Sequence, residues 1–73
     1  MEYTHEILEN GDHYIKVFEG DRTVCFIASP TSDLPEHPLM IDAFNANEER
    51  IQAFAQLLWD NPNTAFTEFV STL

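Results

Sequence analysis

The chain is poor in three kinds of residue, and cysteine is the first of them. Among its 73 residues only Cys25 is a cysteine, so no disulfide can form within the chain. A single thiol is typical of a reducing compartment, and no basic segment followed by an apolar run opens the sequence, so we expect a cytoplasmic protein. No apolar stretch approaches the ~18 residues of a membrane-spanning helix, and we expect no membrane partner.

Glycine is also scarce, which removes several kinds of chemistry. Gly11 and Gly20 are the only glycines, and both suit tight turns, so none remains for a phosphate-binding loop. The histidines, carboxylates and Cys25 show none of the spacings typical of a metal site, and no nucleophile motif occurs. We therefore expect no metal, no cofactor, no catalytic residue and no enzymatic activity.

Basic residues are the third scarcity. Three Lys and Arg stand against 13 Asp and Glu, which gives a formal net charge of −10. Hydrophobic residues nevertheless make up 44 % of the chain and include six Phe, whereas disordered acidic chains are poor in aromatics. A folded domain with this charge repels nucleic acid and is attracted to basic surfaces. We expect no direct nucleic-acid binding and a protein partner with a basic surface.

The length allows one small α+β domain, residues 1–73. A chain this short buries only roughly 60 % of the surface that its unfolded form exposes, so its core is thin. Such domains often depend on a partner subunit. We therefore expect a homodimer.

The first part of the chain has the two-residue period of strands. Asn10-Gly11 is typical of a two-residue type I′ hairpin turn, and Gly20-Asp21 of a type II′ turn. We predict a three-stranded antiparallel meander with strands at about Tyr3–Glu9, Asp12–Glu19 and Arg22–Ser29.

Two-residue turns would fix which side chains share a face of the sheet. The predicted core face carries Leu8, Ile15, Val17, Val24, Phe26 and Ala28, with Thr4, Glu6 and His13. The other face carries Tyr3, His5, Ile7, Tyr14, Lys16, Phe18, Thr23, Cys25 and Ile27. That second face is half apolar, so we expect it to be covered, either by a second protein molecule or by a helix or loop of the chain itself.

The second part of the chain predicts two helices packed on one sheet face. The proline-rich segment 30–38 is predicted as a loop. Leu39–Phe44 is compatible with a short fourth strand, a helical turn or an irregular connector, and we favour the connector. A first helix begins near Asn45 or Asn47, and its buried stripe is Ile51, Phe54, Ala55 and Leu58. Pro62 ends it. A second short helix, capped by Asn63 or Thr64, has the stripe Phe66, Phe69, Val70 and Leu73.

One arrangement of residues is compatible with catalytic chemistry. In the predicted register His5 pairs with Lys16, which neighbours Cys25, so a Cys–His site with an activated thiol is conceivable. Cysteine is also an ordinary small apolar residue on a half-buried strand, and we favour that interpretation.

The predicted partner-binding residues are acidic groups with aromatic residues among them. Aromatic side chains concentrate binding energy at protein interfaces, and carboxylates supply the attraction to a basic surface. The set comprises Tyr3, Glu6, Glu9, Asp12, Tyr14, Phe18, Glu19, Asp21, Glu48, Glu49 and Trp59.

Two resemblances bear on function. The hairpin Tyr3–Phe18 is similar to the first strands of HicB-type antitoxins, but the Leu-Pro-Gly-Cys stretch of that family is absent, so we assign no family. In size and charge the chain resembles small acidic phage inhibitors of the anti-CRISPR or anti-restriction type, which mimic DNA. The sequence hypothesis is a binding module that inhibits a larger protein by docking on its nucleic-acid-binding surface. The alternative is a homodimeric accessory or structural protein whose acidity serves only solubility.

Overall fold

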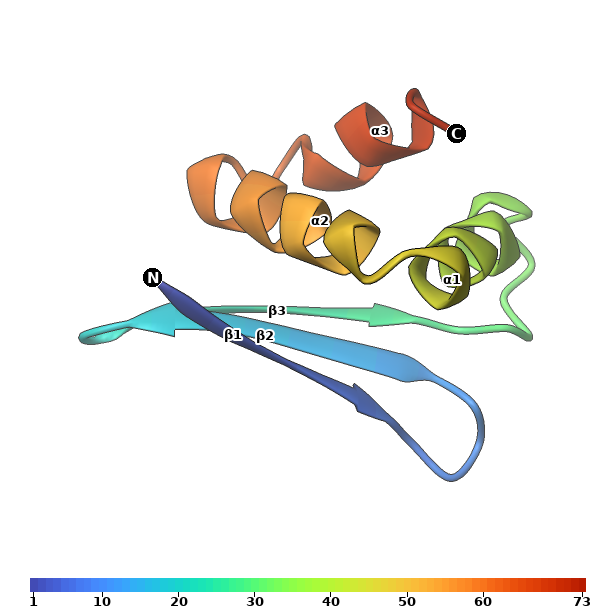
Figure 1. Cartoon of the computed structure of the whole chain (residues 1–73), viewed down its shortest axis with the longest axis horizontal. Coiled ribbons are helices and arrows are strands. Elements are labelled where there is room, and N and C mark those ends of the chain that lie inside the picture. Colours follow the sequence, from blue (N-terminus) through green and yellow to red (C-terminus); the bar gives the residue numbers. More distant parts are fainter.

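A computed structural model describes the whole chain, Met1–Leu73, as a sheet covered on one side by helices. The sheet is antiparallel with strand order β1-β2-β3, and all three helices lie on the same face of it (Figure 1). The predicted α+β class, a three-stranded meander followed by helices on one sheet face, is confirmed. The elements are β1 (Glu2–Ile7), β2 (His13–Glu19), β3 (Arg22–Ala28), α1 (Glu36–Ala46), α2 (Glu48–Asp60) and α3 (Ala65–Val70).

The β2–β3 hairpin has the predicted two-residue turn. Glu19 pairs with Arg22 across Gly20-Asp21. Gly20 has a φ of 58°, and no non-glycine residue has a positive φ. Type II′ turns require a positive φ at the first central residue only, which glycine adopts without strain. The faces of β2 and β3 therefore follow the prediction.

The β1–β2 hairpin differs from the prediction by one residue. Ile7 pairs with His13, so the connection is longer than a two-residue turn. The Leu8 N–H donates to the Asp12 carbonyl at 2.8 Å, and the Gly11 N–H donates to the Leu8 carbonyl at 2.9 Å. Gly11 has a φ of 90°. These are features of a three-residue loop in which a type I turn is followed by a left-handed glycine.

This loop places the side chains of β1 on the opposite faces from those predicted. A one-residue change of register moves every side chain of a strand to the other face. Tyr3 and His5 thus lie on the helix side, paired with Val17 and Ile15. Thr4 and Glu6, predicted in the core, lie on the other side, and Leu8, also predicted in the core, lies in the loop and is 38 % exposed.

Helix α1 is the second correction, because it was predicted as a loop and an irregular connector. Pro38 is the third residue of the helix. The first N–H groups of a helix have no intrahelical partner, so proline is tolerated there. Met40, Ile41 and Phe44 are buried on one side of α1. The protein therefore has three helices instead of two.

Helices α2 and α3 lie close to the predicted positions. Asn47, the second of the two predicted start points, caps α2 by accepting a hydrogen bond from the Glu49 N–H at 2.9 Å. The predicted stripe of α2 is buried in full. Thr64 occupies the N-cap position of α3 without a capping side-chain bond. The α3 stripe is only partly confirmed, since Phe69 is buried and Leu73 is 47 % exposed.

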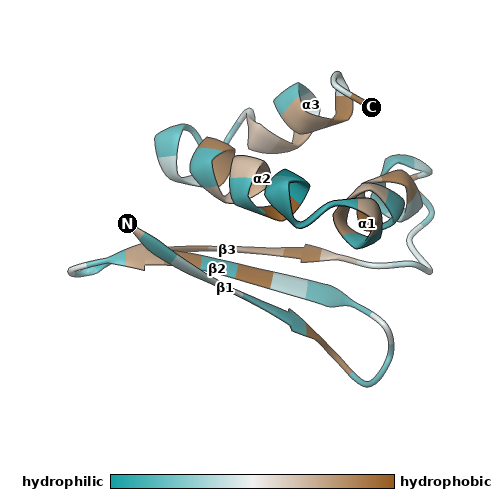
Figure 2. Ribbon diagram, in the orientation of Figure 1, coloured by the Kyte–Doolittle hydropathy of each residue, from teal (hydrophilic) through white to brown (hydrophobic).

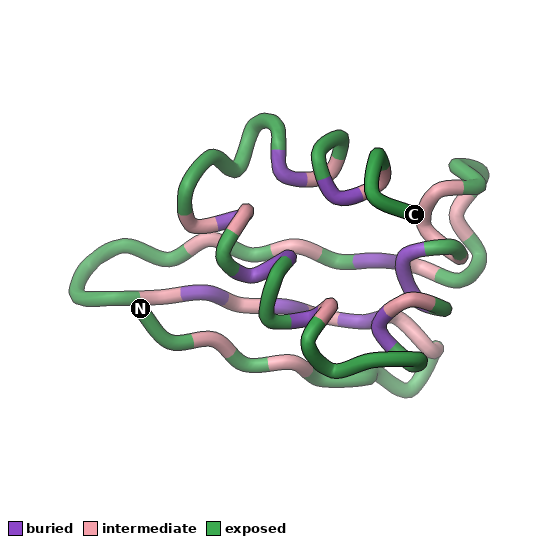
Figure 3. The backbone as a smooth tube through the Cα atoms, turned by 45° about the horizontal axis from the view of Figure 1, so that its top comes forward, coloured by how far each residue is buried: buried purple, intermediate pink, exposed green.

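The core is an aromatic cluster between the sheet and the helices. The ring centroids of Phe26, Phe44 and Phe69 lie 4.9, 5.8 and 5.1 Å from that of Phe54. Figure 3 shows the buried residues gathered on the central strand and on the sheet side of the helices. Ile15 and Val17 of β2 are fully buried beneath this cluster.

A pair of histidines closes one end of the core. His5 Nε2 and His13 Nδ1 are 2.8 Å apart, and the stacked rings have centroids separated by 4.9 Å. His13 is only 3 % exposed, and both rings contact Phe44. Burial lowers the pKa of His5, opposed by Glu48. Burial and then the neighbouring His5 lower the pKa of His13, opposed by Asp12.

Replacing Phe54 with Ala is expected to remove a large part of the protein's free energy of unfolding. The substitution removes the fully buried ring at the centre of the cluster and costs about 3–5 kcal/mol. A 73-residue domain has a free energy of unfolding of about 4–11 kcal/mol. Leu39→Ala, at a 53 % exposed position of α1, is the control and is expected to change this free energy by less than about 0.5 kcal/mol. Urea denaturation followed by circular dichroism measures both.

The histidine pair predicts a loss of stability as the pH falls. Both folded-state pKa values lie below the ordinary value of 6.5, so the unfolded chain takes up protons that the folded chain does not. The free energy of unfolding therefore decreases as the pH falls through this value. The double variant His5→Gln/His13→Gln keeps every carboxylate and is the reference. Parallel stability curves of the two proteins between neutral and mildly acidic pH would contradict the prediction.

Candidate binding face

The side of the sheet without helices is the candidate site, here called the open face. No helix or loop of the chain lies over it (Figure 1). Of the two covers considered from the sequence, a segment of the chain itself is thus excluded. The open face consists of Glu2, Thr4 and Glu6 from β1, Tyr14, Lys16 and Phe18 from β2, and Thr23, Cys25 and Ile27 from β3.

Side chains on the open face contact one another across the strands. The Tyr14 hydroxyl lies 3.2 Å from Cys25 Sγ. The hydrogen bond to Cys25, with smaller effects of burial and Glu6, raises the pKa of Tyr14. Lys16 Nζ lies 5.4 Å from the centre of the Phe18 ring. The open face therefore combines aromatic and polar side chains with three charged ones, Glu2, Glu6 and Lys16.

Carboxylates flank both ends of the open face. Glu9 and Asp12 belong to the β1–β2 loop, and Asp12 receives a hydrogen bond from the Asn10 side chain at 3.1 Å. Asp21 belongs to the β2–β3 turn at the other end (Figure 1), whereas Glu19, the last residue of β2, lies on the helix side with Ile15 and Val17. The Met1 amino group lies 2.8 Å from Glu19 Oε1, and this bond and charge lower the pKa of the Glu19 carboxyl.

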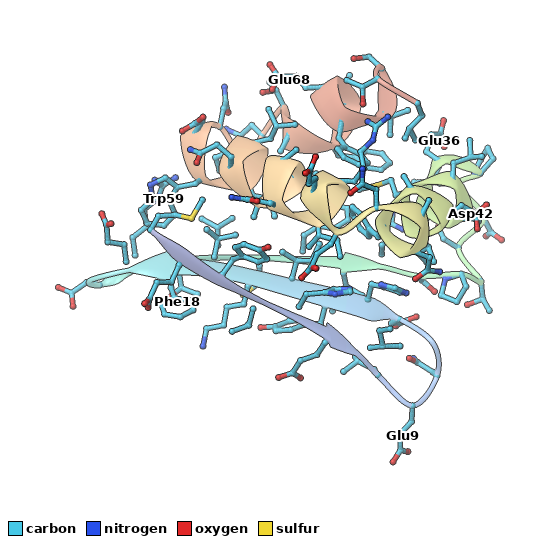
Figure 4. All side chains as sticks on the ribbon, in the orientation of Figure 1. Glu9, Phe18, Glu36, Asp42, Trp59 and Glu68 are labelled. Atoms are coloured by element: carbon cyan, nitrogen blue, oxygen red, sulfur yellow. The ribbon has the colours of Figure 1, made fainter.

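The remaining predicted residues lie elsewhere. Tyr3 is half-buried on the helix side of the sheet and packs against the core. Glu48 and Glu49 form the first turn of α2. Trp59 lies near the end of α2, and Phe18 points away from the helices on the opposite side of the sheet (Figure 4). The structure thus brings together Glu6, Tyr14 and Phe18 on the open face, with Glu9, Asp12 and Asp21 in the connections at its two ends.

The three basic side chains all lie over aromatic rings. The Arg22 guanidinium carbon is 4.1 Å from the centre of the Trp59 ring, and that of Arg50 is 5.9 Å from the Phe69 ring. Lys16 lies over Phe18, as described above. The only ion pair of the protein joins the Met1 amino group to Glu19. The other carboxylates form no ion pair, so their negative charge is not compensated within the chain.

These carboxylates are distributed over much of the surface. Every helix and strand except β3 carries at least one. In Figure 4 Glu9 lies at the tip of the β1–β2 loop, Asp42 on the outer side of α1 and Glu68 on α3. They do not form a single row like the phosphates of a DNA strand.

The conceivable Cys–His site is excluded by the register of β1. His5 lies on the helix side, whereas Cys25 lies on the open face. No group of three or more His, Cys, Asp or Glu side chains is arranged to hold a metal ion, and no pocket indents the surface. No helix combines the length and the apolar composition needed to span a membrane.

Sequence reasoning missed two features. It did not pair His5 with His13, which the three-residue loop brings face to face. It also did not include Lys16 and Ile27 among the binding candidates, although both were placed on the face now found open. The alternation of β2 and β3 was sufficient to find Lys16 and Ile27, whereas the histidine pair required the correct loop length.

Comparisons with protein-family models, curated proteins and solved structures found no match to this chain. Any function must therefore be argued from its own residues.

The contact between Tyr14 and Cys25 gives a prediction that can be read in the spectrum. Cys25→Ala is expected to bring the pKa of Tyr14 back down toward the ordinary value of 10.0, because the hydrogen bond that raises it is lost. Ultraviolet absorbance during an alkaline titration measures ionisation of the phenol. Tyr3→Phe is the background, so that Tyr14 is the only tyrosine observed. An unchanged titration would show that the two side chains do not interact.

Proposed function

We propose that this protein is a non-enzymatic binding module whose open face, with its acidic ends, docks on the basic surface of a larger protein. The basic surface is one that otherwise binds nucleic acid, so docking inhibits the larger protein by competition. The observation that carries the proposal is that the carboxylates, apart from Glu19, have no cationic partner within the chain. All three cations lie over aromatic rings, and the only ion pair involves the chain's own amino terminus.

The uncompensated charge supports rapid association with a basic surface. A folded protein of net charge −10 attracts a cationic partner over a distance of about one Debye length, about 8 Å at physiological salt. Charges at the rim of an interface mainly increase the association rate. Glu9, Asp12 and Asp21 hold this position at the two ends of the open face.

Aromatic residues on the open face supply short-range contact. Tyr14 and Phe18 are half-buried between neighbouring strands although no helix covers them. Tyrosine is among the residues that concentrate binding energy, and an already ordered side chain loses little entropy on binding. Because the carboxylates do not form a single row, the proposal rests on overall attraction and on this face, and not on a copy of the phosphate spacing.

The test is capture of a partner followed by its release. Immobilised protein is incubated with a lysate at low salt, and a retained protein is challenged with salt and with duplex DNA. The proposal expects a basic nucleic-acid-binding protein that duplex DNA displaces and that high salt releases, because exposed charge pairs are screened. A partner that remains bound at high salt and in the presence of DNA would contradict it.

Matched charge variants locate the contact. Glu9→Gln/Asp21→Asn neutralises one carboxylate at each end of the open face, and Asp42→Asn/Glu68→Gln makes the same change in net charge on the helix side. The first pair is expected to weaken binding roughly 3- to 10-fold more than the second, as lost charge pairs near a surface do. Equal weakening would mean that the open face is not the contact surface.

A further inference from the structure

The outer edge of β3 has unpaired backbone groups. A type II′ turn closes with a hydrogen bond between its first and last residues, here Glu19 and Arg22. Along an antiparallel strand, residues then alternate between bonding to the neighbouring strand and pointing away from it. Val24 and Phe26 therefore bond to β2, whereas Thr23, Cys25 and Ile27 direct their N–H and C=O groups outward.

Nothing in the chain satisfies these outward groups. β3 is the last strand of the sheet, and no turn, loop or helix forms a backbone hydrogen bond to Thr23, Cys25 or Ile27. Ile27 is 48 % exposed, and Thr23 and Cys25 are exposed as well. The inner-face residues Val24 and Phe26 are only half-buried, so a neighbouring strand would cover them further.

This edge lacks the features that normally prevent strands from pairing. Natural edge strands carry charges, proline or bulges that block a further strand. The β1 edge has Glu2 and Glu6, but β3 has no charge, proline or glycine from Thr23 to Ala28. Figure 2 shows β3 as hydrophobic over most of its length, in contrast to β1.

We propose that a second copy of this chain pairs with the β3 edge, so that two meanders form one six-stranded sheet. The segment from Arg22 to Ser32 has no carboxylate and includes one cation, Arg22. By contrast, each of the remaining strands and helices carries at least one acidic residue. Two molecules of net charge −10 therefore repel each other least at this edge. A basic foreign strand would instead be attracted to the carboxylates elsewhere.

The register of the pairing follows from the outward groups. An antiparallel arrangement centred on Cys25 places Thr23 opposite Ile27 of the second copy and forms about six backbone hydrogen bonds. It also places Val24 opposite Phe26 of the second copy, an aromatic and β-branched pair that is favourable across strands. The two open faces become continuous. The proposal stands on the β3 edge alone and holds whether or not the open face binds a basic partner.

Salt separates this proposal from the function proposed above. Added salt screens the repulsion between two acidic copies, so the dimer is expected to strengthen with salt, whereas binding to a basic partner weakens. Sedimentation equilibrium in the presence of a reductant measures the dimer without interference from a disulfide. A protein that remains monomeric at high concentration and high salt would overturn the dimer and leave the proposed function untouched.

Amide hydrogen exchange in the unmutated protein identifies the interface. In the monomer the Val24 and Phe26 amides are protected and those of Thr23, Cys25 and Ile27 are not. At high protein concentration all five are expected to be protected. A dimer without this change would use another surface, and protection that arises only when a lysine-rich extended peptide is added would mean that the edge takes a foreign strand. Either result overturns the proposal.

A proline substitution tests the same edge by mutation. Cys25→Pro removes an outward N–H without removing a bond to β2, and proline is accepted in edge strands at such positions. It is expected to weaken the dimer by more than about tenfold, because the central hydrogen bonds are lost. Cys25→Ala removes the thiol but keeps the N–H, and it is expected to dimerise like the unmutated chain. If Cys25→Pro does not fold, the amide exchange pattern decides alone.

Discussion

The three-residue loop that ends in Gly11 sets the pairing of β1 with β2, and most of the structure depends on that pairing. It turns Tyr3 and His5 toward the helices and Thr4 and Glu6 away from them. The side chains that point toward the helices complete one end of the core, where His5 stacks on His13 against Phe44. A Cβ on Gly11 would lie 3.3 Å from Pro30 Cγ, and its φ of 90° strains any other residue. One residue type at one position thereby governs the composition of both sheet faces.

The core is small and largely aromatic. Six phenylalanines in 73 residues provide large apolar surfaces, and three of them pack around a fourth, Phe54. The accessible surface is 4617 Å², close to the roughly 4600 Å² that the size relation gives for a folded chain of 8.4 kDa. The single chain is therefore as compact as its size predicts, although the open face and the β3 edge are uncovered.

Charge acts differently at these two surfaces. Because the cations lie over Phe18, Trp59 and Phe69, they shield aromatic rings and leave the carboxylates unopposed. A strongly acidic surface favours cationic partners and disfavours other copies of itself. The uncharged stretch of β3 is the exception on this surface. In the proposed function and the proposed dimer, the same net charge thus favours a basic protein at the open face and confines self-association to the β3 edge.

The fold class, the β2–β3 turn and the buried stripe of α2 were determined by the sequence itself, because each depends on residues a few positions apart. Tyr14 and Phe18 of the candidate face were placed correctly for the same reason. The tertiary structure alone decided the face of Glu6, the histidine pair and helix α1. A two-residue and a three-residue loop at Asn10-Gly11 are both locally acceptable, and so are a helix and a connector at Leu39–Phe44. Burial of Tyr3, His5, Met40 and Phe44 between sheet and helices distinguishes them, and that burial exists only once distant segments pack together.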